Sequence, residues 1–532
     1  MADNTVKIDC HDGFVESRDD IPLKESDGSV ISDDENTEYP PLAKFIPILI
    51  GLCLQAFCTA LDNTILATAV PKITEQFNSL EDISWYASAY LLTSCAVTLP
   101  FGKVYTYYST KWTYIIALTI FEIGSLACAA TKTSQGLIFG RAIAGIGSGG
   151  LAPGALLVLA NSLPVHRRAL YFGIIGSMGG IATVTGPLIG GLLTDHASWR
   201  WCFYINIPLG AITGVFITAF FRNPKSTQRR KSGKMSKVKQ MDPIGIVVFI
   251  PAIVSVLLGL QWGGTKYEWS NVRIIVLFVL FVLFSSGWCY IQYCKQEEAT
   301  VPPHILANRN IIGAVTHAMF FGGSFFVFGY YLPIWFQAIE QASASESGIN
   351  NLPMVVSMII FSAVGGVLVN ILGYYTPFMF LGSILLTIGS ALCTTFKVHT
   401  KIGKWVGYQI LIGIGAGTVL PSRDIPIGIA VITFAQSLSG SLFISIAQNV
   451  FQNRLVASVS KYAPMIRPQA VVEAGASHLS HRFSPEALPA VLYAYNRAVT
   501  QTFYVSVAAA TLSFIGAGLV QWRSMKRPQK YA

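Results

Sequence analysis

One carboxylate stands alone in a long apolar run near the start of the chain. Asp62 lies in the stretch LQAFCTALDNTILATAVPKI, within an apolar segment that begins at Phe45. An ionised side chain inside a hydrocarbon layer costs about 3 kcal/mol on insertion scales, so it usually faces a protein interior or water. A carboxylate held there can take up and release a proton. The alternative is a structural aspartate with Asn63 and Thr64 as hydrogen-bond partners.

Two further charged residues interrupt apolar runs. Arg141 opens the stretch GRAIAGIGSGG, and Glu122 falls in the middle of IALTIFEIGSLACAA. A guanidinium keeps its charge and can stabilise a nearby carboxylate, although Arg141 could also extend to the lipid headgroups. For Glu122, binding of a substrate cation, proton carriage and a buried pair with Arg141 are all open. We expect Asp62, Arg141 and Glu122 to be the proton-coupling residues.

The stretch GGIATVTGPLIGG combines close packing with a bend. Gly186, Gly190 and Gly191 carry no side chain, so a neighbouring helix can approach closely at these positions. Pro187 lacks a backbone N–H donor and bends a helix. This arrangement predicts a bent helix that packs tightly against a neighbour.

An aromatic segment, THAMFFGGSFFVFGYYLPIWFQAI, offers residues for a ligand cavity. Aromatic faces stack on flat ligands, and a histidine can take a proton near neutral pH. The alternative is packing against other helices or lipid. The predicted cavity residues are His317, Phe325, Tyr330, Tyr331, Trp335 and Gln337.

The elements that position these residues follow from composition. The 532 residues are 52% hydrophobic and only 12% charged, with a mean hydropathy of +0.52. A soluble domain carries about 25% charged residues. Runs of about 20 apolar residues span a bilayer, and the chain has about fourteen of them. The predicted spans are 45–70, 85–104, 112–130, 136–160, 170–193, 201–221, 243–262, 272–294, 311–335, 350–372, 376–396, 405–420, 425–450 and 502–521.

Charge outside the spans predicts the orientation of the chain. Residues 1–39 carry twelve Asp or Glu against three Lys or Arg, so we expect residues 1–41 to be a disordered acidic tail in the cytosol. Basic residues concentrate in 222–241 and in 522–532. Lys and Arg near span ends mark the cytosolic side. The net charge of +10 therefore indicates topology and a lipid bilayer as partner, not nucleic acid.

The fourth and twelfth spans repeat one another. Gly145-Ile-Gly147 aligns with Gly413-Ile-Gly415, which also places Arg141 on Gln409. Such offsets predict two six-helix halves separated by two extra spans, and duplicated halves are common in secondary transporters. The twelfth span is short, because residues 405–420 reach only about 24 Å as a helix. Either this helix is truncated, the following PSRD enters the membrane edge, or the gene sequence has lost a piece.

Five motifs in order resemble a known family. They are LDNTILATAVPKI, GRAIAGIGSGG, GPLIGG followed by WRWCFYINIPLG, YYLPIWFQAI, and the run from DIPIG to FAQSLSGSLFISIAQNVFQNRL. Across residues 42–526 the chain is similar to the fourteen-span drug:proton antiporters of the major facilitator superfamily, in their fungal toxin-efflux branch. Two features depart from the family pattern: Thr106 stands where the loop acid is usual, and a late Gln-Pro element of the twelfth span is absent.

The resemblance implies an all-α polytopic membrane protein with the major facilitator fold. Its expected parts are a six-helix bundle at 42–221, two linker helices within 242–310, and a second six-helix bundle at 311–521 that contains an exterior loop, 451–501. Within the family the 141 position belongs to the proton-coupling motif, and GP-x-x-GG is the antiporter motif that favours exchange.

The expected function is proton-coupled export of a small, largely apolar organic compound, most simply a fungal secondary metabolite or toxin. A broad multidrug exporter, a siderophore-type permease and a transport-dead membrane sensor are the alternatives. We expect no enzymatic activity, no cofactor, no metal, and a proton gradient as energy source, because no nucleotide-binding motif is found. A monomer in the plasma membrane, or in a vacuolar or vesicle membrane, is expected.

Overall fold

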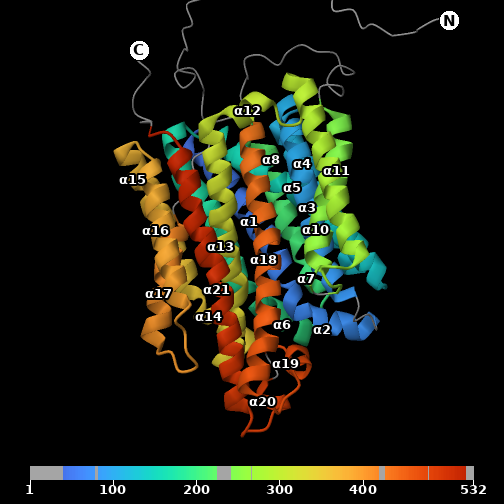
Figure 1. The fold of residues 1–532 in the computed structure, drawn as a ribbon. Coiled ribbons are helices and arrows are strands. Elements are labelled where there is room, and N and C mark those ends of the chain that lie inside the picture. Colours follow the sequence, from blue (N-terminus) through green and yellow to red (C-terminus); the bar gives the residue numbers. More distant parts are fainter. Residues whose placement is uncertain are drawn as a thin grey trace, which may run out of the picture. The chain divides into compact units, whose positions relative to one another are not determined.

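The computed structural model describes residues 40–77, 82–223, 241–264, 266–417, 426–476 and 479–522. These residues are mostly helical and contain no β-strand (Figure 1). The predicted acidic tail, the basic segment 222–241, the carboxyl-terminal tail and the PSRD stretch fall almost wholly outside the described residues.

The first half of the chain supplies six of the predicted spans. Its helices are α1 (Leu42–Thr64), α2 (Leu66–Phe77), α3 (Ile83–Tyr107), α4 (Thr110–Ala130), α5 (Ser134–Ala160), α6 (Val165–His196), α7 (Trp201–Tyr204) and α8 (Asn206–Phe220). Side-chain oxygens cap two of them: Ser109 accepts from the Trp112 N–H and Thr133 from the Gly136 N–H. Caps of this kind satisfy donors that the helix cannot.

The linker region and second half supply the remaining eight spans. Their helices are α10 (Pro243–Trp262), α11 (Val272–Lys295), the 3₁₀ turn η2 (Gln296–Glu298), α12 (Pro303–Ala307), α13 (Arg309–Ile339), α14 (Ala344–Asn350), α15 (Leu352–Leu372), α16 (Thr376–Cys393), α17 (Ile402–Ala416), α18 (Pro426–Tyr462), α19 (Pro468–Ala474), α20 (Leu479–Arg482) and α21 (Leu488–Leu519). Among the described residues, eleven helical stretches are long and apolar enough to cross a membrane. Helices α3, α6 and α17 occupy the other three predicted spans.

Three predicted boundaries need correction. The first span breaks at Ile65, where α1 gives way to α2. The predicted loop 451–501 is largely helical, because α18 continues to Tyr462 and α21 begins at Leu488. Buried apolar residues such as Leu455 and Val491 join these extensions to the core of the second half.

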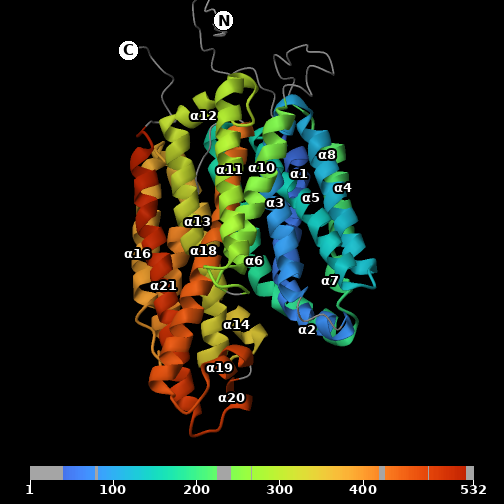
Figure 2. The same cartoon turned by 45° about the vertical axis from the view of Figure 1, so that its right-hand side comes forward.

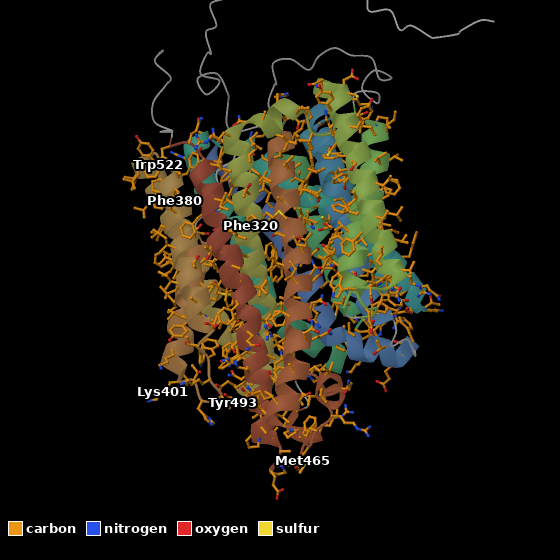
Figure 3. The ribbon with its side chains drawn as sticks, viewed as in Figure 1. Phe320, Phe380, Lys401, Met465, Tyr493 and Trp522 are labelled. Atoms are coloured by element: carbon orange, nitrogen blue, oxygen red, sulfur yellow. The ribbon has the colours of Figure 1, made fainter. Side chains whose placement is uncertain are left out.

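The two ends of the second half are visible from labelled side chains. Figure 3 shows Phe380 and Trp522 at one end of the helices, and Lys401, Tyr493 and Met465 at the other. The Phe380 and Trp522 rings are in contact, with centroids 6.4 Å apart. The charge pattern assigns this end, where the chain enters its basic tail, to the cytosol.

Two equivalent helix pairs join the halves. Helix α3 of the first half packs against α18 of the second, and α15 of the second packs against α6 of the first. Figure 1 shows α18 at the junction of the two halves, and Figure 2 shows the same helices turned by 45°. At the first pair, Leu99 of α3 belongs to the same apolar cluster as Ile427 and Val431 of α18. At the second, a side chain on Gly173 would meet Ser362 at 2.8 Å.

Close glycine contacts recur in both halves, as the repeat predicts. A Cβ on Gly145 would lie 2.3 Å from the Tyr90 carbonyl oxygen of α3, and one on Gly413 would lie 2.2 Å from that of Met354 in α15. Contacts below 3.0 Å between such atoms are impossible without movement, so each glycine lets two helix backbones touch. Helix α5 therefore packs on α3 as α17 packs on α15, and the duplicated architecture is confirmed.

The linker helices α10 and α11 differ in how they contact the rest of the protein. Helix α11 packs on α10 and is otherwise almost wholly exposed, whereas α10 also contacts α3 and α18. At the start of α10, the buried Asp242 carboxylate accepts bonds from the Gly245 N–H at 2.9 Å and the Gln292 Nε2 at 2.9 Å. It also accepts from Thr300 Oγ1 at 2.8 Å and pairs with Lys295 Nζ at 2.8 Å. We call this cluster the Asp242 latch.

The latch predicts a pH-sensitive contribution to stability. Burial alone would raise the pKa of Asp242, but the bonds from Lys295, Gln292, Thr300 and the Gly245 N–H outweigh it and hold this pKa below its usual range. A carboxyl whose pKa is depressed on folding stabilises the protein above its ordinary pKa of about 3.9. That stabilisation disappears as the pH falls through the depressed value.

We expect Asp242→Ala to lower the free energy of unfolding by about 1–3 kcal/mol, since the donors around it stay buried without an acceptor. The matched control is Glu268→Ala, an exposed carboxylate at the opposite end of the same helix pair. Thermal unfolding of both variants at neutral and acid pH measures the effect. A loss equal in the two variants, or one that does not shrink in acid, would contradict the role of the latch.

Candidate functional site

The structure brings Asp62 and Arg141 together. Asp62, near the end of α1, and Arg141, two turns into α5, are both fully buried and form an ion pair through Oδ2 and Nη1. Arg141 Nε also donates to the Tyr86 carbonyl oxygen at 2.7 Å, and its guanidinium lies 4.4 Å from the centre of the Tyr90 ring. The guanidinium is thus held by an anion, a carbonyl and an aromatic face. The extension of Arg141 to headgroups is excluded by this burial.

A neutral amide completes the surroundings of Asp62. Asn206 Nδ2 donates to Asp62 Oδ1 at 3.3 Å and to Ser125 Oγ at 3.3 Å. These residues come from α8, α1 and α4; with Arg141 of α5 and the Tyr86 and Tyr90 contacts of α3, five helices of the first half meet at this ion pair. A buried pair is stable only when further hydrogen bonds satisfy its remaining atoms. The proposed local partners Asn63 and Thr64 instead bond backbone oxygens, Asn63 to Thr59 and Thr64 to Ala60, Leu61 and Ala182.

The GP-x-x-GG stretch lies directly beside this site. Thr64 Oγ1, two residues after Asp62, donates to the Ala182 carbonyl oxygen of α6 at 3.0 Å. A Cβ on Gly186 would come within 2.2 Å of Thr64 Oγ1, whereas one on Gly191 would have no neighbour within 4 Å among the described residues. Gly186 therefore allows α6 to touch the end of α1. Helix α6 runs unbroken through Pro187 and Gly190.

Glu122 lies one helical turn from this cluster but does not pair with Arg141. Glu122 lies on the same face of α4 as Ser125. Its Oε1 fills the space beside Gly210, and a Cβ added to that glycine would lie only 1.9 Å from it. Both carboxylate oxygens are buried and have no hydrogen-bond partner among the residues that the structure describes. The pair with Arg141 is therefore excluded as a description of this structure, because Asp62 takes that position.

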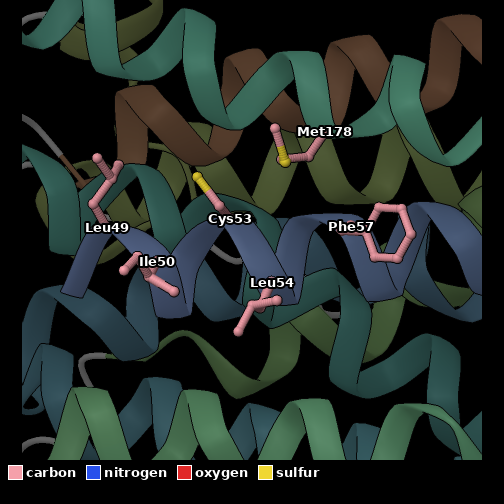
Figure 4. Close-up of a pocket in the computed structure, with 6 residues that line it drawn as sticks. All are labelled: Leu49, Ile50, Cys53, Leu54, Phe57 and Met178. Atoms are coloured by element: carbon pink, nitrogen blue, oxygen red, sulfur yellow. The ribbon is translucent and has the colours of Figure 1, made fainter. Parts of the chain in front are cut away.

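An apolar pocket of about 250 Å³ lies along the same helix α1. Figure 4 shows its lining, with five side chains from α1 and one, Met178, from α6. The α1 residues are Leu49, Ile50, Cys53, Leu54 and Phe57. Phe57 and Asp62 are five residues apart, which is about 7.5 Å along a helix axis.

The predicted cavity residues of α13 divide between two faces. His317, Tyr331 and Trp335 are fully buried toward α18 and α21. His317 Nδ1 lies 3.2 Å from the Ser513 carbonyl oxygen, Tyr331 Oη donates to Gln448 at 2.7 Å, and Trp335 Nε1 donates to Asn496 at 2.8 Å.

Three of the predicted residues are less enclosed. Tyr330 is 49% exposed, and Phe325 and Gln337 are half-buried. Tyr330 and Gln337 are seven residues apart and share a face of α13. The six residues therefore do not form one cluster: His317, Tyr331 and Trp335 serve packing in the second half, and Tyr330 and Gln337 lie on another face.

Sequence reasoning missed Tyr86 and Asn206, which hold the ion pair, and Asp242 of the latch. Asn206 could have been found as a polar residue in the apolar stretch YINIPLG. Asp242 stands before a proline and an apolar run, which is the signature of a helix start. The Tyr86 contact uses its backbone carbonyl, so its side-chain identity carries no signal.

Known proteins match this chain over most of its length. The model of the Major Facilitator Superfamily matches residues 52–463. The MFS-type transporter ptmT of Penicillium ochrochloron is 50% identical over 513 residues, covering 94% of this chain and 90% of that protein. The efflux pump roqT of Penicillium rubens is 50% identical over 495 residues, covering 91% and 92%. The MFS-type efflux pump MFS1 of Trichophyton rubrum is 48% identical over 514 residues, covering 94% and 96%.

Solved structures agree on the fold. The human organic anion transporter MFSD10 superposes with a TM-score of 0.53 at 12% identity, covering 91% of this chain and all of that one. A bacterial homologue of the lysosomal transporter Spinster gives 0.53 at 15% identity, covering 90% and 98%. The all-α major facilitator fold and the resemblance to fungal efflux carriers are confirmed, and a membrane-embedded enzyme is excluded by this kinship. The chain is a multi-pass membrane protein that belongs to the major facilitator superfamily of transporters.

Proposed function

We propose that this protein exports a small, largely apolar organic compound, a secondary metabolite or toxin of a fungal cell, in exchange for protons. The names of the relatives roqT and MFS1 describe efflux pumps. The lining of the α1 pocket is apolar apart from the Cys53 thiol, which suits a ligand with few polar groups. The protein would act as a monomer in the plasma membrane.

The observation that carries the proposal is a buried ion pair on a helix that also lines the pocket. Asp62 and the pocket residue Phe57 belong to the same helix, so a shift of α1 alters both. When Asp62 takes up a proton, its attraction to Arg141 is lost and the reason for the close approach of α1 and α5 disappears. Removal of the proton restores the pair.

A mechanical route leads from this pair to the other half. Thr64 is two residues from Asp62 and bonds to α6, where Gly186 packs against it. Helix α6 in turn packs against α15 of the second half. A change at Asp62 would therefore reach the interface on which alternating access depends, and the antiporter motif Gly186, Pro187, Gly190 and Gly191 forms part of this route.

Substrate would contact α1, α6 and the less enclosed face of α13. The proposed contacts are the pocket residues Phe57 and Met178, with Tyr330 and Gln337 on α13. The side chains of Tyr331 and Trp335 are occupied by Gln448 and Asn496. Those residues would instead keep α13 fixed against its neighbours.

The test is Asp62→Asn, which keeps the shape and removes the charge. We expect proton-driven export of an apolar dye from cells at matched surface levels to fall roughly 5- to 150-fold, the range for a coupling free energy of roughly 1–3 kcal/mol. Substrate binding to the purified variant should persist, because the pocket is unchanged. The matched control is Asn63→Ala, the exposed neighbour on the same helix.

Equal export by wild type and Asp62→Asn would remove Asp62 from the coupling mechanism. Loss of binding together with loss of export would assign Asp62 to the substrate site instead. Export by wild type that survives collapse of the proton gradient would contradict proton coupling itself.

A further inference from the structure

Several buried polar groups in the first half have no hydrogen-bond partner among the described residues. They are both side-chain ends of Gln55, the hydroxyl of Tyr114, both oxygens of Glu122, Oδ1 of Asn206 and Nη2 of Arg141. A buried polar group without a hydrogen-bond partner destabilises a folded protein, because it has lost its bonds to water and gained none in return. A run of such groups in one small region of an apolar bundle is unusual, because folded proteins contain only a few per hundred residues.

These groups follow one another along the helix axes. Gln55, Cys58 and Asp62 share a face of α1, since they are spaced by three and four residues. On α4, Glu122 and Ser125 share a face, and on α8 Asn206 and Gly210 do the same. Asn206 bridges Asp62 and Ser125, which places the three faces around one interior space.

The order of the groups runs toward the predicted cytosolic end. Helices α1 and α4 both start at that end. Gln55 therefore lies about 10 Å nearer to the cytosol than Asp62, and Tyr114 about 16 Å nearer than Ser125, at 1.5 Å per residue. Glu122 lies one helical turn nearer to the cytosol than Ser125, between the level of Asp62 and the levels of Gln55 and Tyr114. The distances between successive polar groups along this order are ones that a few hydrogen-bonded water molecules could bridge.

Glycine provides room at the middle step. Because Gly210 has no side chain, the Glu122 carboxylate reaches into the space between α4 and α8. The carboxylates of Asp62 and Glu122 are close enough for their charges to interact, and the Cys58 thiol is close enough to interact with both carboxylates. The other titratable or charged groups that interact with members of this space are Arg141 of α5, Tyr114 and Cys128 of α4, Tyr90 of α3, Cys202 of α7 and Cys53 of α1. Helix α8 contributes the neutral residues Asn206, Gly210 and Thr213.

We propose that water molecules occupy this interior and that Glu122 is a second proton-carrying site, which receives the proton from Asp62 on its way to the cytosol. The O–H bond at Asp62 breaks, a water molecule relays the proton, and an O–H bond forms at Glu122. Asp62 returns to Arg141 as a carboxylate. Gln55 and Tyr114 then orient the water that carries the proton onward.

This path runs through the interior of the first half and bypasses the substrate pocket. Of the pocket residues, Leu49, Cys53 and Phe57 follow one another at four-residue steps on α1, a different face from that of Gln55 and Asp62. Proton and substrate would therefore use separate faces of one helix. The inference rests on the proposed proton coupling, and its test needs no substrate.

The first experiment is infrared spectroscopy of the purified full-length protein in lipid nanodiscs. Across a pH titration, wild type should show a protonated-carboxyl band that Glu122→Gln removes and Asp62→Asn leaves in place. In heavy water this band should shift within the time of buffer exchange, because hydrated carboxyl groups exchange their protons quickly. Glu122→Gln keeps the side-chain shape, and its thermal unfolding checks that it folds.

A second pair of variants tests the water path. Tyr114→Phe should slow the heavy-water shift of the Glu122 band, since it removes a hydroxyl that has no hydrogen-bond partner in the described part of the chain. The matched control, Tyr105→Phe, removes a buried hydroxyl that donates to the Gly150 carbonyl oxygen at 2.9 Å, and should leave the exchange rate unchanged.

The outcomes separate this inference from the proposed function. A band that survives Glu122→Gln, or one that resists exchange, would show that Glu122 is not a hydrated proton site and would overturn the inference. A Glu122 band that exchanges in heavy water, and whose exchange is slower in Tyr114→Phe, would support the inference even if no export were detected. In that case proton-coupled export alone would have failed.

Discussion

Arg141→Met should abolish proton-driven transport and lower the free energy of unfolding by about 3–5 kcal/mol, because it leaves Asp62 as an unpaired buried carboxylate. The lost bond to the Tyr86 carbonyl oxygen adds to this effect. Methionine replaces the apolar stem of the arginine but has no N–H group to donate to either partner. Thermal unfolding in detergent and surface abundance in cells measure the stability loss, and dye export measures the transport loss.

The double variant Asp62→Asn/Arg141→Met is the control for this result. It removes both charges, so folding and abundance should recover toward those of wild type while export stays low. Arg141→Lys should be intermediate, since an ammonium keeps the charge but lacks the planar set of donors. Failure of the double variant to recover abundance would mean that the ion pair is not the cause of the loss.

Gly147→Ala should prevent normal assembly of the first half. A Cβ on Gly147 of α5 would lie 2.4 Å from the Phe121 backbone nitrogen of α4 and 2.7 Å from the Ala117 carbonyl oxygen. Backbone atoms cannot rotate away, so the two helices must separate. Added atoms in a packed core cost about 1–3 kcal/mol, and separation along the tight α4–α5 contact should bring the cost to the upper end of this range.

Gly176→Ala on α6 is the matched control, because a Cβ there would meet no atom of the described residues within 4 Å. Alanine favours a helix over glycine by about 1 kcal/mol, so this variant should be as stable as wild type or more so. Gly415→Ala, whose Cβ would lie 2.7 Å from the Leu386 nitrogen, should repeat the Gly147 loss in the second half. Equal unfolding temperatures for all three variants would contradict the close contacts.

The spans were predictable because each is a long apolar run, and each predicted span contains a helix. The ends were less predictable. Nothing in the apolar pattern marks the break at Ile65, where the chain turns from α1 into α2. Polar residues after position 450 suggested a loop, but one face of the α18 and α21 extensions is apolar enough to bury Leu455 and Val491.

The site was predictable in its members and not in its pairing. Asp62, Arg141 and Glu122 stand out because charge is rare in such segments. Which carboxylate meets Arg141 depends on how α1, α4 and α5 cross, and Asp62 and Arg141 are 79 residues apart in the chain. The sequence also did not indicate which face of α13 is buried, because aromatic residues occur all round that helix. The hydrogen bond from Trp335 to Asn496 of α21 identifies one buried face.

The position of α10 has a consequence for the energy of transport. This helix contacts α3 of one half and α18 of the other. It also packs against α11, which is exposed on almost all of its remaining surface. In the proposed exchange cycle the halves move against each other, α10 would not keep both contacts unchanged, and α11 would be displaced through the surrounding lipid. Work done on the bilayer would then be part of each cycle, and the thickness and fluidity of the membrane would help to set the rate of transport.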